Sequence, residues 1–127
     1  MKLALDTNAY SAAARGEPRS VALMQAAQHV YLPFVVLAEL RAGFAAGTLG
    51  RRNEALLARF LGSPRVSVLY GDEQTTHHYA NVFAQLRKQA TPIPTNDIWI
   101  AAIVLQHDLA LLTSDAHFSS LPQLARA

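Results

Sequence analysis

Short apolar segments alternate with segments of helical spacing along this chain, and the alternation strongly limits the folds open to it. The segments at residues 2–5, 30–32, 66–69 and 110–113 are predicted to be strands. Short apolar strands that are each followed by a helix are typical of a parallel sheet with both faces covered. We therefore predict an α/β fold with a short central parallel sheet.

The helices between these strands are predicted from apolar spacing, capping residues and breaks at glycine and proline. A break at residues 15–19, which contains Gly16 and Pro18, is expected to separate the first two helices. The expected helices cover residues 7–14, 21–28, 34–46, 51–61, 73–89 and 96–107. A chain of 127 residues suits one domain, so residues 1–127 are predicted to form a single unit.

Four of the nine acidic residues lie where an apolar segment meets a turn or enters a helix. Their segments are LALDTN, LAELRAG, PTNDIWIAA and LLTSDAHF, with the carboxylates Asp6, Glu39, Asp97 and Asp115. Sites in parallel sheets form at the carboxyl ends of the strands, which is where Asp6 and Asp115 fall. Such a cluster repels itself unless a divalent cation neutralises it, so metal-dependent phosphoester chemistry is the leading hypothesis.

Each of these acids also has a purely structural explanation. Asp6 is placed to cap a helix, and Asp97 suits the positive end of a helix dipole. Glu39 is explained equally by a solvent-facing position or a distant arginine partner, and Asp115 by a turn. Their joint placement favours Mg²⁺ or Mn²⁺, which prefer carboxylate oxygen and water as ligands. A carboxylate that is not bound to the metal is available as general base.

Composition removes several other kinds of chemistry. The absence of cysteine excludes disulfides, zinc–thiolate sites and a cysteine nucleophile. Neither a glycine-rich phosphate loop nor a serine nucleophile elbow is present. His77 and His78 are adjacent and point to different helix faces, and His29, His107 and His117 are scattered, so all five histidines are expected in surface or core roles.

The charge distribution suits a polyanionic substrate. With the four acids assigned to one pocket, eleven basic residues face five remaining acids (9 − 4 = 5), which leaves a charge of +6 (11 − 5) elsewhere. Nine of the basic residues are arginine, which binds phosphate in a bidentate manner. Arg51 and Arg52 are candidates for contact with an RNA backbone, although a solvated helix start explains them as well.

The chain is expected to be soluble and cytoplasmic. The apolar run near the amino terminus is short and interrupted by Asp6, which argues against a secretory signal. No apolar stretch approaches the roughly 20 residues that a membrane span needs. The lack of cysteine is compatible with a reducing compartment.

The four acidic segments, in this order, resemble those of the PIN-domain ribonucleases, and in particular the VapC-type toxins of toxin–antitoxin pairs. The resemblance covers essentially the whole chain. It implies a three-layer α/β/α domain, Mg²⁺- or Mn²⁺-dependent endonucleolytic cleavage of RNA, a homodimer, and a cognate antitoxin whose C-terminal segment lies across the active-site groove. It also implies an acidic catalytic and metal-binding set and supporting hydrogen bonds, namely Asp6, Glu39, Asp97 and Asp115 with Thr7, Asn8 and Ser114.

Two features depart from the family pattern, and three alternatives stay open. After the final motif the sequence continues only to residues 124–127, so a last strand is expected to be missing or degenerate, and PTND stands where a Gly-Pro pair is usual.

One alternative is a PIN-like housekeeping nuclease for RNA processing or repair. A haloacid-dehalogenase phosphatase is another, although it requires an acid where this chain has Asn8. In the third, a non-enzymatic binding domain, the four acids are caps and surface groups.

Overall fold

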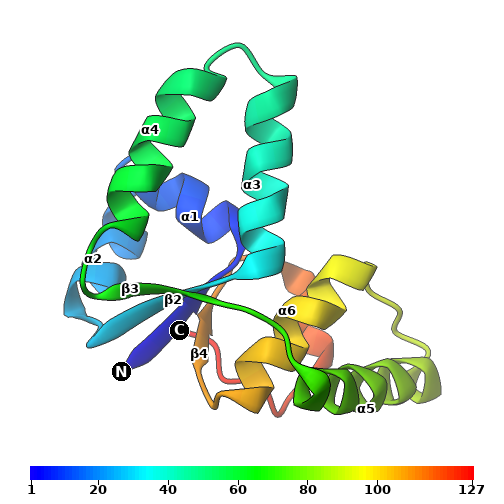
Figure 1. The fold of residues 1–127 in the computed structure, drawn as a ribbon. Coiled ribbons are helices and arrows are strands. Elements are labelled where there is room, and N and C mark those ends of the chain that lie inside the picture. The colour runs from blue at the N-terminus through cyan, green and yellow to red at the C-terminus, as the bar shows by residue number, and fades with distance from the viewer.

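The computed structural model, which describes residues 1–127, contains one four-stranded sheet in the order β3-β2-β1-β4. The strands are β1 (Lys2–Leu5), β2 (His29–Pro33), β3 (Val66–Leu69) and β4 (Ala110–Leu112). All three pairings are parallel. Since β1 lies between β2 and β4, the residues that follow β1 and β4 emerge side by side at the carboxyl edge of the sheet (Figure 1).

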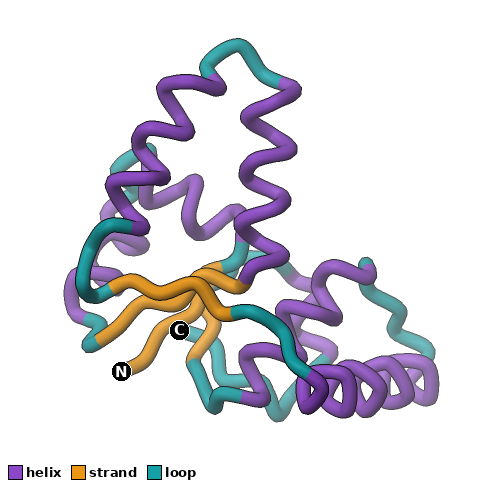
Figure 2. The backbone as a smooth tube through the Cα atoms, in the orientation of Figure 1, coloured by secondary structure: helices purple, strands orange, loops and turns teal.

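Helices cover both faces of this sheet, which confirms the predicted α/β architecture. The helices are α1 (Thr7–Ala14), α2 (Pro18–Ala26), α3 (Phe34–Ala46), α4 (Gly50–Leu61), α5 (Glu73–Gln89) and α6 (Thr95–Gln106), with the 3₁₀ helix η1 (Ala116–Ser120). The first four helices lie on one side of the sheet, and α5 and α6 lie on the other (Figure 1). A hairpin of α3 and α4 extends away from the strands (Figure 2).

The core forms around the central strand and α6. Leu3, Ala4 and Leu5 of β1 are fully buried, as expected for an apolar strand with both faces covered. Helix α6 contributes buried residues on most of its faces, because it packs against α5, α3 and η1 together. No helix of the structure combines the length and the apolar character of a membrane span.

The predicted break at residues 15–19 is wrong in its second half, because α2 begins at Pro18. Proline is well suited to the first position of a helix, where its missing N–H is not needed. The carboxylate of Glu17 caps this helix by accepting hydrogen bonds from the backbone N–H groups of Arg19 (3.1 Å) and Ser20 (2.8 Å). The proline therefore starts a helix here rather than interrupting one.

The segment after β4 contains one element that was not predicted and one that was. Helix η1 was missed, because its five residues are too few for helical periodicity to be visible. The degenerate last strand was predicted, and it consists of a single parallel bridge between Leu111 and Arg126. The Leu111 N–H donates to the carbonyl of Ala125 at 2.8 Å, and the Ala127 N–H donates to the carbonyl of Leu111 at 2.9 Å.

Candidate metal centre

Asp6 lies directly after the central strand and is 5% exposed. One carboxylate oxygen, Oδ1, accepts the backbone N–H of Ala9 at 2.8 Å, so Asp6 is the N-cap of α1. The other oxygen, Oδ2, accepts the hydroxyl of Thr113, which follows β4. Asp6 can therefore cap α1 and also belong to a functional site, because its carboxylate lies at the edge where sites form in parallel sheets.

Glu39 reaches the same edge from the second turn of α3. Its Oε1 accepts the Thr7 hydroxyl at 2.7 Å, and its Oε2 accepts the Asn96 side-chain amide at 3.4 Å. These bonds join α3 to the beginnings of α1 and α6. Glu39 therefore points into the region between helices and has no arginine partner, which leaves its negative charge available for a cation.

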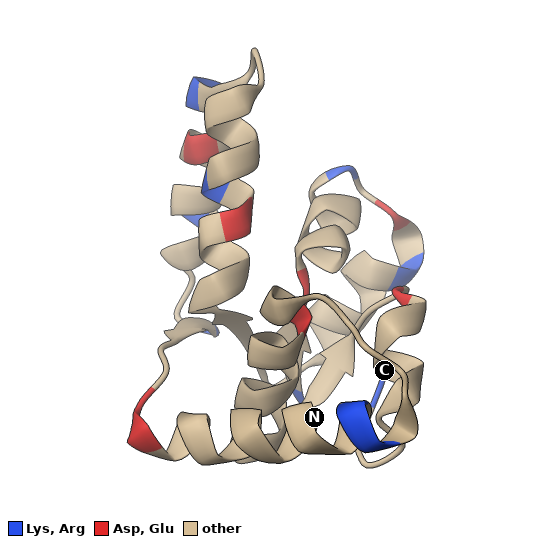
Figure 3. Cartoon of the chain, turned by 90° about the vertical axis from the view of Figure 1, so that its right-hand side faces the viewer, with Lys and Arg blue, Asp and Glu red and all other residues tan.

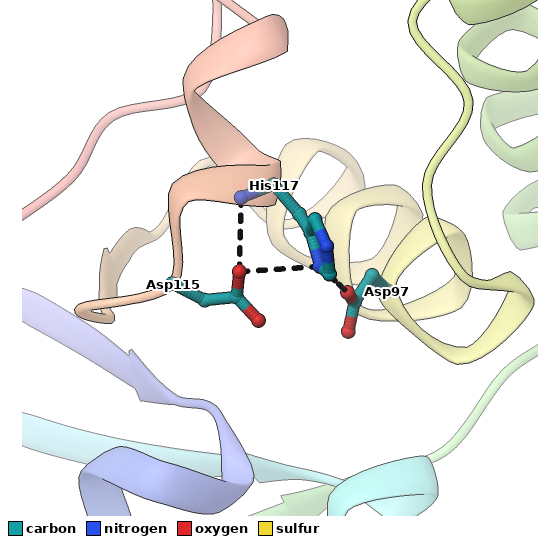
Figure 4. A group of neighbouring side chains, drawn as sticks. All are labelled: Asp97, Asp115 and His117. Carbon is teal, nitrogen blue, oxygen red and sulfur yellow. Dashed lines mark hydrogen bonds and ion pairs between the residues drawn. The ribbon is translucent and has the colours of Figure 1, made fainter.

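Asp97 and Asp115 approach each other from α6 and from the end of β4. Asp97 lies in the first turn of α6, and Asp115 is the N-cap of η1. The imidazole Nδ1 of His117 lies between them, 2.9 Å from Asp97 Oδ2 and 3.1 Å from Asp115 Oδ1 (Figure 4). The backbone N–H of His117 also donates to Asp115 Oδ1 at 2.9 Å, which fixes the orientation of that carboxylate.

The four carboxylates influence one another electrostatically. Burial raises the pKa of Asp6, the hydrogen bonds from Thr113 and Ala9 oppose this rise, and the charges of Asp115 and Glu39 add to it. Burial likewise raises the pKa of Asp97, with a hydrogen bond to His117 opposing the rise and the charges of Asp115 and Glu39 increasing it. A group of partly buried, mutually repelling carboxylates offers the hard oxygen ligands that a divalent cation prefers.

Comparison with known proteins assigns the chain to a family. The family description "PIN domain" matches residues 3–124 of the chain. The chain belongs to the PIN domain family. Among its relatives is a plasmid stability protein, StbB, of Pseudomonas syringae pv. tomato, which is 34% identical over 87% of this chain and 86% of its own length. Ribonuclease VapC1 of Haemophilus influenzae is 32% identical over 86% of this chain and 83% of its own length.

A solved structure has the same arrangement of elements. VapBC-1 from nontypeable Haemophilus influenzae superposes with a TM-score of 0.84 at 27% identity, covering 100% of this chain and 97% of that one. This similarity supports the three-layer α/β/α fold expected for the PIN domain. The fold places the carboxylates together through strand order and not through closeness in sequence.

The side chains that hydrogen-bond to the acids of this PIN domain differ in part from those that the family resemblance implied. Thr7 binds Glu39, as described above. The side chains of Asn8 and Ser114 are exposed and make no hydrogen bond within the chain. Thr113 and Asn96 make such bonds instead, and Thr113 also accepts the backbone N–H of Asp115 at 2.9 Å. The position of Thr113 at the carboxyl end of a predicted strand is the signal that would have identified it.

His117 is exposed, as the predicted surface role allows, but its contact with the acids was not predicted. The sequence assigned all five histidines surface or core roles, whereas the ring nitrogen of His117 contacts two of the four acids. The spacing Asp-Ala-His directly after a strand was the available signal. It was missed because contact with Asp97, twenty residues earlier, depends on the tertiary fold.

Arg51 and Arg52 lie in the first turn of α4, next to the tip of the α3–α4 hairpin. Arg52 lines a cavity together with Arg15 and Phe44, and none of the four acids lines that cavity. Figure 3 shows basic and acidic positions alternating along the hairpin, with a basic position near its tip. The two arginines thus lie apart from the acidic cluster, on a projecting part of the PIN domain.

Proposed function

We propose that this protein is a divalent-metal-dependent endoribonuclease that acts as the toxin of a toxin–antitoxin pair. The observation that carries the proposal is a group of carboxylates at the carboxyl edge of the parallel sheet of a PIN domain. Asp97 and Asp115 lie within reach of one cation. Asp6 is joined to Asp115 through Thr113, and Glu39 accepts a hydrogen bond from Asn96, the neighbour of Asp97. The naming of several relatives as ribonucleases supports it. So do two solved neighbours, VapBC-1 and a member of the VapBC family of toxin–antitoxin systems. Its site of action would be the cytoplasm, where the RNA is.

Carboxylates of this group would hold the cation, which we propose is Mg²⁺ or Mn²⁺. Their oxygens are hard ligands. Burial and the charges of neighbouring acids raise the pKa values of Asp6 and Asp97, and a bound cation would stabilise both carboxylates in their charged form. The bound cation would polarise the scissile phosphate and lower the pKa of a water molecule. A water molecule activated in this way attacks the phosphate, so no nucleophilic side chain is required.

The chain's own residues would position the reacting groups and take up a proton. Thr113 and the Ala9 N–H hold both oxygens of Asp6, and Thr7 and Asn96 hold those of Glu39. These carboxylates therefore need little reorganisation when substrate binds. The attacking water forms a bond to phosphorus and gives its proton to a carboxylate. The phosphorus–oxygen bond to the departing nucleotide then breaks, and that oxygen takes up the proton held by the carboxylic acid, which restores the carboxylate.

A carboxylate that the metal leaves free would act as general base. Asp6 is the least suited of the four to that role, because it is 5% exposed and both of its oxygens already accept hydrogen bonds. We assign Asp6 to metal binding.

RNA is the proposed substrate because the sequence outside the four acids carries eleven basic residues against five acidic ones. Arg51 and Arg52 project from the first turn of α4, where they would contact the phosphate backbone of an RNA that extends beyond the cleavage site. Such contacts carry little sequence information. The nucleotide preference would instead come from the shape of the loops around the four acids.

An antitoxin is a suitable partner for the apolar cavity between α1, α2 and α4. This cavity is lined mostly by hydrophobic residues, among them Tyr10, Met24 and Phe60. It shares Tyr10, Ala14 and Leu56 with the adjoining cavity, which contains Arg15 and Arg52. An apolar groove that ends at two arginines fits a segment with apolar and acidic side chains.

A second copy of the chain would cover the exposed aromatic residues beside α3 and α5. Phe34 is 47% exposed and Tyr70 66% exposed, and their rings lie 6.0 Å apart. Phe83 of α5 is 46% exposed and stacks on Tyr79. Large apolar side chains gathered on one face mark a protein interface. We propose a homodimer through this face.

Cleavage of a mixed cellular RNA pool tests the enzymatic part of the proposal. The purified chain, freed of any antitoxin, should give discrete fragments with Mg²⁺ or Mn²⁺ and none with EDTA. Asp97→Asn should abolish the fragments. Asp108→Asn is the matched control, because Asp108 lies outside the cluster at a positive φ of 53° that asparagine tolerates. Equal cleavage by the wild type and Asp97→Asn would refute the assignment.

Expression in a bacterial host separates a toxin from a housekeeping nuclease. Induction of the wild-type chain should arrest growth, and Asp97→Asn should not. Co-expression of the protein encoded beside it should restore growth. Cleavage in vitro without any arrest of growth would favour the housekeeping function.

A further inference from the structure

The position of the His117 ring nitrogen gives the acidic cluster a donor of a second kind. We propose that His117 is a nitrogen ligand that makes the Asp97–Asp115 part of the centre selective for Mn²⁺ over Mg²⁺. This inference rests on the proposed metal-dependent function. It concerns which ion the centre prefers, and the function itself requires only that some divalent ion binds.

Three potential ligand atoms converge on one spot. His117 Nδ1, one oxygen of Asp97 and one oxygen of Asp115 all lie within 4.8 Å of one another. The nitrogen is 2.9 Å and 3.1 Å from the two oxygens. Neighbouring ligands of an octahedral ion with bonds of about 2.1 Å are themselves about 3 Å apart, so the nitrogen already stands at ligand spacing from both carboxylates.

A single cation satisfies this arrangement better than hydrogen bonds alone. Nδ1 carries at most one proton, and that proton points well at only one of the two oxygens. Without a proton, the nitrogen lone pair faces two negatively charged groups. A metal ion shared by all three atoms removes both difficulties, because each atom then donates a lone pair to the same positive charge.

The fold holds the imidazole in this place. His117 lies in η1, and the next residue, Phe118, is completely buried. Leu121, which follows η1, is also buried, so the backbone on the carboxyl side of His117 is anchored in the core. The His117 N–H to Asp115 Oδ1 bond fixes the backbone as well. Rotation of a loop is therefore not needed to bring the ring to the acids.

The chemistry of the donors gives the direction of the selectivity. Mg²⁺ prefers oxygen ligands and keeps several of its waters, so a nitrogen adds little to its binding. Mn²⁺ also prefers carboxylate oxygen, but as a first-row transition ion it accepts an imidazole nitrogen more readily than Mg²⁺ does. Replacing an oxygen donor or water by His117 should therefore strengthen Mn²⁺ binding and leave Mg²⁺ binding nearly unchanged.

Direct measurement of metal binding by the purified, antitoxin-free chain tests this proposal. Free Mn²⁺ is followed by electron paramagnetic resonance, and Mg²⁺ is measured by competition. His117→Ala should weaken Mn²⁺ binding by about tenfold or more, since removing even the supporting partner of a ligand costs that much. The change in Mg²⁺ affinity should be much smaller. His77→Ala, at an exposed histidine of α5, is the matched control.

A spectroscopic readout identifies the ligand independently of affinity. Mn²⁺ bound to the wild type should show hyperfine coupling to an imidazole nitrogen, and ¹⁵N-labelled histidine should change that coupling. The coupling should disappear in His117→Gln, which keeps a polar side chain at this position, and should persist in His77→Ala. Circular dichroism of both variants establishes that they are folded.

The outcomes separate this inference from the function on which it rests. Mn²⁺ binding that is lost in Asp97→Asn but unchanged in His117→Ala, with no nitrogen coupling, overturns the role of His117 and keeps the metal site. Stronger binding of both ions by His117→Ala also overturns it, because the imidazole is then a competitor for the carboxylates. No Mn²⁺ or Mg²⁺ binding by the wild type overturns both proposals.

Discussion

Replacing Thr113 with valine removes one hydroxyl from the acidic cluster and keeps the branched shape of the side chain. That hydroxyl donates to Asp6 Oδ2 and accepts the backbone N–H of Asp115 at 2.9 Å. It thus connects the end of β4 to the carboxylate that follows β1. Asp6 is 5% exposed, so water does not easily replace the lost donor.

The magnitude follows from the two hydrogen bonds. A bond to a charged group contributes about 1.5–3 kcal/mol and a neutral one about 1 kcal/mol, so Thr113→Val should lower the free energy of unfolding by about 2–4 kcal/mol at neutral pH. The Thr113 bond lowers the pKa of Asp6, which means that it favours the ionised form. Its contribution is therefore full where Asp6 is ionised and declines as falling pH protonates Asp6.

Urea denaturation in EDTA at pH 7 and at pH 3.5 measures both parts of this prediction. The loss of stability in Thr113→Val should be smaller at the acidic pH. Thr113→Ser keeps the hydroxyl and should retain most of the stability, and Thr91→Val removes only an exposed bond from Gln89. A loss below about 0.5 kcal/mol at pH 7, or an equal loss at both pH values, would refute the reasoning.

Three further predictions concern stability and RNA binding. Asp6→Asn should raise the free energy of unfolding of the metal-free chain at neutral pH, because burial raises the pKa of Asp6 and its ionisation therefore opposes folding. In urea denaturation with EDTA, this increase in stability should disappear as the pH falls toward 3.8, where Asp6 is protonated in the folded chain. Phe118→Ala should cost about 3–5 kcal/mol because Phe118 is fully buried, whereas Phe83→Ala should cost far less by the same assay. Replacing Arg51 and Arg52 together by alanine should raise KM for RNA with kcat unchanged; an unaltered KM contradicts their proposed RNA contact.

Much of the fold was predictable because local signals and tertiary packing agree. Helix α5 spans Glu73–Gln89 as predicted, since Asp72 caps it and its apolar spacing is regular. Strand β3 and helix α3 also have the predicted bounds. Where the prediction was wrong, at Pro18, one residue type permits two outcomes. Proline ends a helix within its body and begins one at its first position.

The contacts within the site were harder to predict than its acidic residues. The acids stand out because a carboxylate next to an apolar segment is costly without a partner. Thr113 and His117 carry no such signal, since threonine and histidine are ordinary at turns. Their importance depends on which strand lies beside which, and the sequence alone did not determine the neighbours of β1. Only once β4 is known to pair with β1 does Thr113 fall next to Asp6.

The strand order also determines when the centre can exist during synthesis. Asp6 and its hydroxyl partner Thr113 are 107 residues apart in the sequence, and β4 must pair with β1 before they meet. A growing chain that has not yet passed Asp115 therefore lacks two parts of the centre, whatever the state of its earlier elements. Newly made chains on a ribosome would be inactive for most of their synthesis. A partner that captures the chain as it folds would thus meet it before it has cleaved any RNA.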